Sequence, residues 1–380
     1  MEILNALKSK KRVNGLTHNF YKYPARFSPN FAKEVIQKYT EEGDCVLDPF
    51  MGGGTTIVEA IAHGRKALGI DINPLSFFVT KAKTTPISDQ DKHEIINWAQ
   101  SLDFRYDFNC DLIARDTRLK NLPSNIKNLL FYLVSSTQSL NFPRQKTFAR
   151  CALLKLGSWA LDCRKDIPEI DSWKNRLIEF VFEMINGLDE FVACCSNNDI
   201  KKNKITSQRI LIHGSIKNAI KEKKFSKFLL KSKLILTSPP YPGVHILYHR
   251  WQVRGRRETP APFLITNQID GHGESYYTLG SRTSYGLKKY FSELETIFRQ
   301  IKQFINQDSL IIQLLAFNDP DNQIPSFLDT MKSSGFKETI PFKQLDQVRP
   351  VREVPNRKWY TNSTANNCSS QEILFFHKPH

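Results

Sequence analysis

The chain has 380 residues, of which 40% are hydrophobic and 24% are charged, and its formal net charge is +16 at pH 7. This length is sufficient for one large core with an accessory region, and the basic charge favours a polyanionic partner, with nucleic acid as the first candidate. We find neither a signal peptide nor an apolar run that could span a bilayer, so we expect a cytoplasmic protein without a membrane partner.

The N-terminal part begins with a segment up to about Thr17 that is rich in Lys and Asn, for which we expect a loose basic arm. An aromatic segment follows at 18–29 and contains Tyr23, Pro24 and Ala25. Ser28 before Pro29 is a typical helix start, with Ser at the N-cap and Pro in the first turn.

A glycine-rich turn separates the first predicted strand from the next helix. The strand at 45–48 leads into Asp48-Pro49-Phe50-Met51-Gly52-Gly53-Gly54-Thr55-Thr56, and the helix stops at Gly64. Glycines let the backbone approach a ligand closely, so this pattern predicts a cofactor cradle. A dinucleotide fingerprint would require a third glycine where Ile57 stands, which points to another class of cofactor.

A second short strand, at 67–70, ends in Asp71. A carboxylate about 20 residues beyond a glycine turn is placed to accept hydrogen bonds from two ribose hydroxyls. The alternative is a helix-capping or solvent-exposed carboxylate, and the register with the glycine turn favours the ribose contact. Asn73 before Pro74 predicts the start of the following helix.

Residues 86–205 interrupt this alternation of strands and helices. Apolar residues from Trp173 to Val192 recur with the helical period, and 148–161 is also typical of a helix. We interpret this region as a helical insertion that serves either target recognition or dimerisation and packing. The sheet resumes with a strand at 210–215 that ends in Ser215.

A twin-proline turn follows the buried strand at 234–236. It reads Thr237-Ser238-Pro239-Pro240-Tyr241. The two prolines hold the backbone extended, so that the carbonyls and the Ser238 hydroxyl form an acceptor-rich corner for an amino group, beside an aromatic face on Tyr241. An ordinary proline turn after a strand is the alternative.

Two basic and aromatic segments follow, and we expect loops in both. The first extends to Tyr285 and the second lies between two predicted antiparallel strands near 338–342 and 371–376. Basic and aromatic residues interleaved in this way suit phosphate contacts and base stacking, although a solvated loop remains the alternative. The candidate DNA-binding residues are Arg250, Arg254, Arg256, Arg257, Arg282, Arg357 and Lys358. Neither the histidines nor the seven cysteines have metal-site spacing, so we assign no metal.

The glycine turn and the twin-proline turn resemble two motifs of the amino-methyltransferases, which methylate exocyclic amino groups of DNA bases. The Ser-Pro-Pro-Tyr form is most typical of the cytosine-N4 branch. The resemblance implies an α/β fold of the class I methyltransferases: a Rossmann-like, mostly parallel seven-stranded sheet with an antiparallel edge hairpin. It divides the chain into residues 1–85, the helical insertion at 86–205, and residues 206–380.

The resemblance also implies roles for individual residues. The family's segment of the Tyr-Pro-Ala-Arg-Phe type closes over the methionine end of S-adenosyl-L-methionine (SAM), although composition alone fits an aromatic packing segment equally well. The cofactor-binding residues would be Tyr23, Pro24, Ala25, Asp48, Pro49, Phe50, Gly52, Gly54, Thr55, Thr56, Asp71 and Ile72, and the catalytic residues Ser238, Pro239, Pro240 and Tyr241. The chain departs from the family at Ser215, where a carboxylate usually contacts the adenine amino group.

The activity implied is transfer of a methyl group from SAM to N4 of cytosine in double-stranded DNA, after base flipping, by the modification enzyme of a restriction-modification system. A cognate endonuclease would act on the same site without a stable complex, and the enzyme would be a monomer or a homodimer. Adenine-N6 methylation is the nearest alternative. An RNA amino-methyltransferase and an inactive nucleic-acid-binding homologue are the others.

Overall fold

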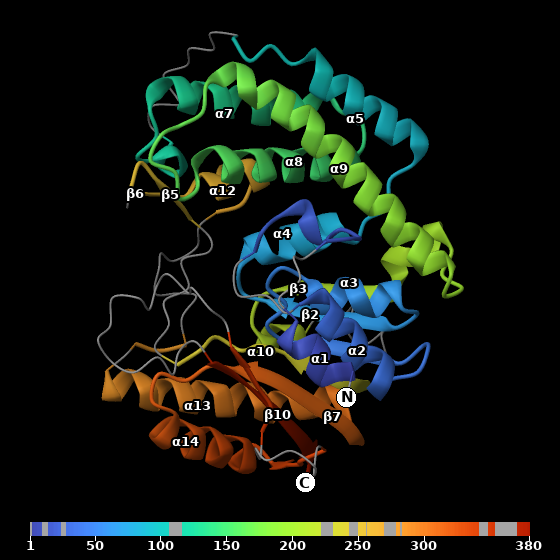
Figure 1. The fold of residues 1–380 in the computed structure, drawn as a ribbon, viewed down its shortest axis with the longest axis vertical. Helices are drawn as coiled ribbons and strands as arrows, with labels where there is room; N and C mark the ends of the chain where they lie inside the picture. Colours follow the sequence, from blue (N-terminus) through green and yellow to red (C-terminus); the bar gives the residue numbers. More distant parts are fainter. Residues whose placement is uncertain are drawn as a thin grey trace.

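The computed structural model describes residues 2–9, 14–23, 28–105, 116–221, 231–242, 250–255, 257–269, 279–281, 283–341, 349–353 and 371–380. Within these ranges, helices cover both faces of one sheet, and a further layer of helices lies beyond one of those faces (Figure 1). None of the helices in these ranges is long and apolar enough to cross a membrane.

The sheet follows the order β3-β2-β1-β4-β7-β10-β8. The strands are β3 (Arg209–His213), β2 (Lys66–Asp71), β1 (Cys45–Asp48), β4 (Ser232–Thr237), β7 (Ile305–Leu315), β10 (Gln371–Pro379) and β8 (Phe336–Glu338). The first five are parallel, whereas β10 is antiparallel to β7 and β8. This confirms the predicted fold class, and the short β9 (Val351–Glu353) adds a pairing with β10.

The order of the sheet reverses between β1 and β4, because the chain builds β2 and β3 on one side of β1 and then returns to its other side. Ligands of open α/β sheets bind outside the carboxyl ends of the strands at such a reversal. The glycine turn leaves the end of β1 and the twin-proline turn leaves the end of β4, so that the two meet at this edge.

Side chains alternate between two cores along the central strands. Leu234 and Leu236 of β4 enter one core, and Ile235 enters the other. The first core is covered by α2 (Pro29–Tyr39), α3 (Thr55–Ala62) and α4 (Pro74–Lys83), and the second mainly by α10 (Ile216–Ala219), α13 (Ser284–Ile301) and α14 (Pro320–Ser333). A strand buried on both faces has a continuous apolar sequence, which explains the unbroken run at 234–236.

Helices also form most of the described part of the predicted insertion. They are α5 (Asp89–Ser101), α7 (Ser124–Ser136), α8 (Pro143–Leu161) and α9 (Ile170–Ser196), with 3-10 turns at Thr117–Leu119, Thr137–Ser139 and Lys202–Gln208. The predicted apolar stripe of α9 is buried, from Trp173 to Phe191. Its residues belong to the same core as α2, α3 and α4, so this layer packs directly onto the sheet's helices (Figure 1). The division at residues 86 and 205 stays a prediction.

Two segments that we expected to be irregular are ordered elements. Residues Glu2–Lys8 form α1, which buries Ile3, Ala6 and Leu7, whereas the sequence indicated a loose arm. The expected loop after the twin-proline turn contains the hairpin of β5 (Trp251–Val253) and β6 (Arg257–Thr259), followed by α12 (Ala261–Thr266). These elements have only three to seven residues each, too few to show a period, and they owe their order to tertiary packing.

The hairpin packs on the helical layer. Trp251 is fully buried, its indole N–H donates to Tyr21 Oη at 3.1 Å, and its ring lies against Gly157 of α8. The Cys163 backbone N–H donates to the Gln252 carbonyl at 2.8 Å. The β5–β6 hairpin, which follows the twin-proline turn in the chain, therefore connects the sheet domain with the helical layer.

Candidate active site

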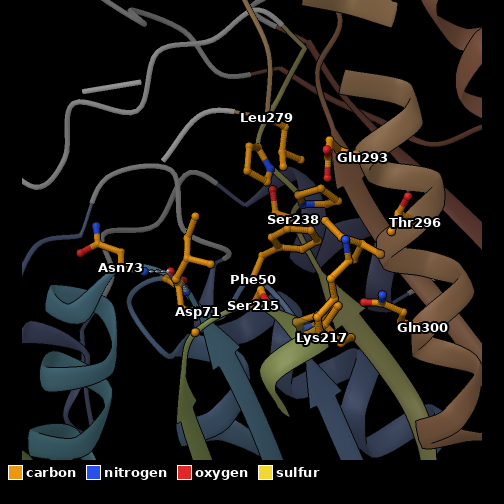
Figure 2. Close-up of a pocket in the computed structure, with 18 of the residues that line it drawn as sticks. Phe50, Asp71, Asn73, Ser215, Lys217, Ser238, Leu279, Glu293, Thr296 and Gln300 are labelled. Carbon is orange, nitrogen blue, oxygen red and sulfur yellow. Dashed lines mark hydrogen bonds between the residues drawn. The ribbon is translucent and has the colours of Figure 1, made fainter. Parts of the chain in front are cut away.

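A cavity of about 400 Å³ lies at the carboxyl ends of the parallel strands. Figure 2 shows that its lining comes from the ends of several strands on one side and from α13 on the other. The lining residues are Tyr23, Pro49, Phe50, Gly52, Asp71, Ile72, Asn73, Gly214, Ser215, Ile216, Lys217, Ser238, Pro239, Pro240, Tyr241, Leu279, Glu293, Thr296, Ile297 and Gln300. The glycine turn and the twin-proline turn thus line one cavity.

The glycines of the glycine turn have two different surroundings: one lines the cavity, and the others pack closely against neighbouring side chains. Gly52 lines the cavity and, like Gly54, has a left-handed backbone, with φ of 48° and 74°. A side chain at Gly54 would start 2.5 Å from Thr80 Oγ1, and one at Gly53 would start 2.7 Å from Tyr23 Cβ. Gly54 therefore makes room for Thr80 of α4, and it is not among the cavity-lining residues. Thr55 and Thr56, in the first turn of α3, are buried behind the cavity.

Asp71 holds the glycine turn in place. Its Oδ2 accepts the Gly52 backbone N–H at 2.8 Å, and its Oδ1 accepts the Asn73 N–H at 2.8 Å. Burial raises the pKa of this carboxyl, against the lowering effect of those hydrogen bonds. Asp71 still lines the cavity (Figure 2), as does Ile72, and the remaining lone pairs of its carboxylate can accept ligand hydroxyls.

Asp48, for which the resemblance implies a cofactor contact, is not among the residues that line the cavity. It is 2% exposed, and Thr237 Oγ1 donates to its Oδ1 at 2.7 Å. The Phe50 backbone N–H donates to the same oxygen at 3.2 Å. Burial raises the pKa of Asp48 to about 7. Asp48 therefore connects the end of β1 to the end of β4, and so joins the two turns that line the cavity.

Besides Thr237, two residues of the twin-proline turn have hydroxyl groups with defined partners. Ser238 Oγ donates to the Leu314 carbonyl at 2.9 Å, and Tyr241 Oη donates to Glu372 Oε1 at 2.7 Å. The two hydroxyl oxygens are 3.4 Å apart. Tyr241 is 9% exposed and lines the cavity. Glu372 was not predicted, although a single carboxylate next to the apolar run of β10 was a signal that could have identified it.

Helix α13 supplies a wall of the cavity that the sequence did not predict. Glu293, Thr296 and Gln300 are spaced by three and four residues and lie on one helical face, with Glu293 near Leu279 and Gln300 near Lys217 (Figure 2). Gln300 Oε1 is buried, and it has no hydrogen-bond partner among the described residues. Their polar spacing was visible in the sequence, but nothing there indicated which loop ends would face it.

Ser215 and Tyr23 lie at the cavity as expected. Ser215 is at the N-cap position of α10, after Gly214, and lines the cavity where the family usually has a carboxylate. Tyr23 Oη accepts the Asn73 side-chain N–H at 3.4 Å. Pro24 and Ala25 lie outside the described residues.

None of the predicted DNA-binding residues within the described ranges lines the cavity. Arg250, Arg254 and Arg257 belong to the hairpin segment, where Arg254 and Arg257 are exposed and Arg250 Nη1 lies 3.6 Å from Glu258 Oε2. Arg256, Arg282, Arg357 and Lys358 lie outside the described residues. No group of three His, Cys, Asp or Glu side chains in the described ranges is arranged to hold a metal ion.

Residues 3–82 match the N6_N4_Mtase family model, described as DNA methylase. Over 75 residues, 19% of this chain, the sequence is 52% identical to the Type II methyltransferase M.MvaI of Kocuria varians. It is 32% identical over 77 residues to the Type II methyltransferase M.MjaII of Methanocaldococcus jannaschii, and 42% identical over 62 residues to the DNA adenine methyltransferase YhdJ of Escherichia coli. These matches support the DNA amino-methyltransferase family.

The amino-methyltransferase match is confined to one side of the cavity. The family model covers Tyr23, the glycine turn and Asp71, and it ends in α4, before the twin-proline turn. The matches span only 16%, 14% and 21% of the three relatives' own lengths. Among solved structures, an rRNA methyltransferase, aviRa from Streptomyces viridochromogenes, aligns over 78% of both chains with 9% identity and a TM-score of 0.28, too low to carry an argument.

Proposed function

We propose that this chain is a SAM-dependent DNA methyltransferase that modifies N4 of cytosine at a specific site in double-stranded DNA. The observation that carries the proposal is that the glycine turn with Asp71 and the twin-proline turn line the same cavity. A methyl donor and an amino group must occupy adjacent places for direct transfer, and one cavity with both patterns provides them. The matches to Type II methyltransferases support a modification enzyme of a restriction-modification system.

The cavity fits the cofactor in its chemistry. Asp71 offers carboxylate oxygens for the two ribose hydroxyls, Ile72 an apolar surface for adenine, and Tyr23 with Gly52 the side for the methionine end. The buried Gln300 Oε1 can accept a hydrogen bond from the adenine amino group of the cofactor. It would thereby replace the carboxylate that the family usually has at the position of Ser215. When bound, SAM supplies a methyl group that is already activated by its positive sulfonium.

The twin-proline turn prepares the amino group of the flipped base. That nitrogen is a poor nucleophile, because its lone pair is delocalised into the ring. Ser238 Oγ donates its own hydrogen to the Leu314 carbonyl, which leaves its lone pairs to accept a substrate N–H beside the Pro239 carbonyl. These acceptors favour a pyramidal nitrogen whose lone pair points at the methyl group, while the base stacks on Tyr241. The nitrogen–carbon bond would form as the carbon–sulfur bond of the donor breaks, with the sulfur leaving as a neutral thioether, and the nitrogen would then lose a proton to solvent.

DNA is held outside the cavity in this proposal. Arg254 and Arg257 are exposed on the β5–β6 hairpin and provide phosphate contacts, which position the duplex without reading its sequence. Flipping the target base costs a few kcal/mol, and the Tyr241 face repays part of that cost by stacking. The enzyme acts in the cytoplasm at the nucleoid as a monomer or homodimer, and a cognate endonuclease cuts the same site without forming a stable complex.

Mass spectrometry of nucleosides tests this function. DNA and, in a parallel reaction, RNA are incubated with the purified chain and SAM labelled in the methyl group, and N4-methylcytosine in the DNA is the expected product. N6-methyladenine alone would replace cytosine with adenine as the target, which the similarity to an adenine methyltransferase makes the second candidate. Label only in RNA, or no SAM binding by calorimetry, would overturn the DNA methyltransferase proposal.

A further inference from the structure

Glu372 is a carboxylate in an unusual place. It is 4% exposed and lies in β10 beside an apolar run that includes the buried Leu374 and Phe375. Burying a carboxylate is costly unless hydrogen bonds and opposite charge compensate it. Groups that contribute to this compensation include Tyr241, whose Oη donates to Oε1 at 2.7 Å, and Arg352, whose Nη1 lies 3.4 Å from Oε2. One of these groups belongs to the twin-proline turn.

The hydrogen bond fixes the direction of the Tyr241 hydroxyl. The Tyr241 hydroxyl donates to Glu372 Oε1, so its hydrogen points towards β10. The Ser238 hydrogen points towards the Leu314 carbonyl of β7. Both hydroxyl hydrogens are therefore directed into the sheet, away from the cavity. The corner beside Ser238 is left with acceptors only, which an amino group requires.

We infer that Glu372 is a positioning residue that orients the hydroxyl and ring of Tyr241, so that the twin-proline turn presents acceptors and one aromatic face to a substrate amino group. This inference rests on the proposed function. Without the carboxylate, the Tyr241 hydroxyl, 3.4 Å from Ser238 Oγ, can turn and donate to that oxygen. It would then compete with the substrate for the same lone pairs, and the ring would lose the anchor at its far end.

A double-mutant cycle tests this role. The variants are Glu372→Gln, Tyr241→Phe and the double variant, and the matched control is Glu353→Gln, an exposed glutamate on the neighbouring β9. The rate constant kcat is measured at saturating SAM and DNA, the Kd of SAM by calorimetry, and the free energy of unfolding in urea. Gln keeps the size of Glu but loses the charge that forces Tyr241 to donate.

We expect Glu372→Gln to lower kcat about tenfold in the wild-type background and less than about twofold in Tyr241→Phe, which has no hydroxyl to orient. The Kd of SAM should change less than about twofold in Glu372→Gln. In the control variant, kcat should also change less than about twofold. Equal kcat losses in both backgrounds, or an unchanged kcat, would overturn the role of Glu372. Additive effects on unfolding would show that the two side chains do not interact, and would overturn it as well.

The design separates this inference from the proposed function. A wild-type chain that binds no SAM and methylates no DNA overturns the proposed function. The positioning role in catalysis then falls as well, whatever coupling the unfolding measurements of the double-mutant cycle show. A wild-type chain that is active, with Glu372→Gln as active as the control, leaves the function intact and removes the positioning role alone.

Discussion

At the scale of single residues, several polar side chains that line the cavity, among them Asp71, Ser238 and Tyr241, have hydrogen-bond partners within the fold. Gln300 is an exception, because its Oε1 is buried and has no partner among the described residues. A buried acceptor without a partner is costly, and a ligand N–H would remove that cost. Its place in the cavity lining makes Gln300 the residue that should respond most clearly to cofactor binding.

We expect Gln300→Ala to raise the Kd of SAM about fivefold, the loss of about one neutral hydrogen bond. Isothermal calorimetry measures this without any need for turnover. Gln303→Ala, on an exposed position just after the same helix, is the matched control and should leave the Kd unchanged. Equal affinity in all three proteins would show that Gln300 does not contact the cofactor.

Asp48 gives a prediction for pH. Burial raises the pKa of its carboxyl from 3.8 to about 7, so the folded state favours the protonated form. The contribution of Asp48 to the stability of the folded state is therefore fully present below the pKa of the unfolded carboxyl, and it is lost as the pH rises through about 7. Asp48→Asn keeps an oxygen that accepts from Thr237 and cannot ionise.

We therefore expect Asp48→Asn to gain stability relative to wild type as the pH rises from 4 to 7, by about 1 kcal/mol per pH unit. Urea unfolding of both proteins at four pH values in this range measures the difference. The same pH slope in both proteins would contradict the assignment of the raised pKa to Asp48.

At the scale of elements, the sequence predicted the strands that carry the site, because each is a short apolar run that ends in a turn of distinctive composition. β1, β2 and β4 were found in this way, together with Asp71 and the residues from Ser238 to Tyr241. The cavity wall from α13 and the Tyr241–Glu372 contact were not found. They depend on which side chains from distant segments face each other, and neither period nor composition contains that information.

The hairpin of β5 and β6 was missed for a related reason. Its anchor, Trp251, is buried against α8, where Gly157 leaves space for the indole. A Gly→Ala change within a helix usually gains up to about 1 kcal/mol from helix propensity. At Gly157 the added methyl would overlap the Trp251 ring, and overpacking costs about 1–3 kcal/mol.

We expect Gly157→Ala to lower the free energy of unfolding by about 1 kcal/mol, the difference between these two effects. Chemical denaturation measures it, with Ser158→Ala on the partly exposed next position as the control. A higher free energy of unfolding in Gly157→Ala would show that Trp251 does not pack tightly against α8.

At the scale of the whole molecule, the helical layer is not a separate body. The residues of α8 and α9 share one core with α2, α3 and α4, and Trp251 links the segment after β4 to that layer. We expect a single unfolding transition in differential scanning calorimetry, with equal calorimetric and van't Hoff enthalpies. Two resolved transitions would favour an independently folding insertion at 86–205.

The shared core also decides how the molecule would handle a long, stiff substrate. Two domains joined by a hinge can open, admit a duplex and close around it, but parts that share one packed core do not move apart in this way. The protein would instead keep a fixed shape. The nucleic acid would have to supply the bending and the rotation, and the speed of a catalytic cycle would depend on how readily the target site distorts.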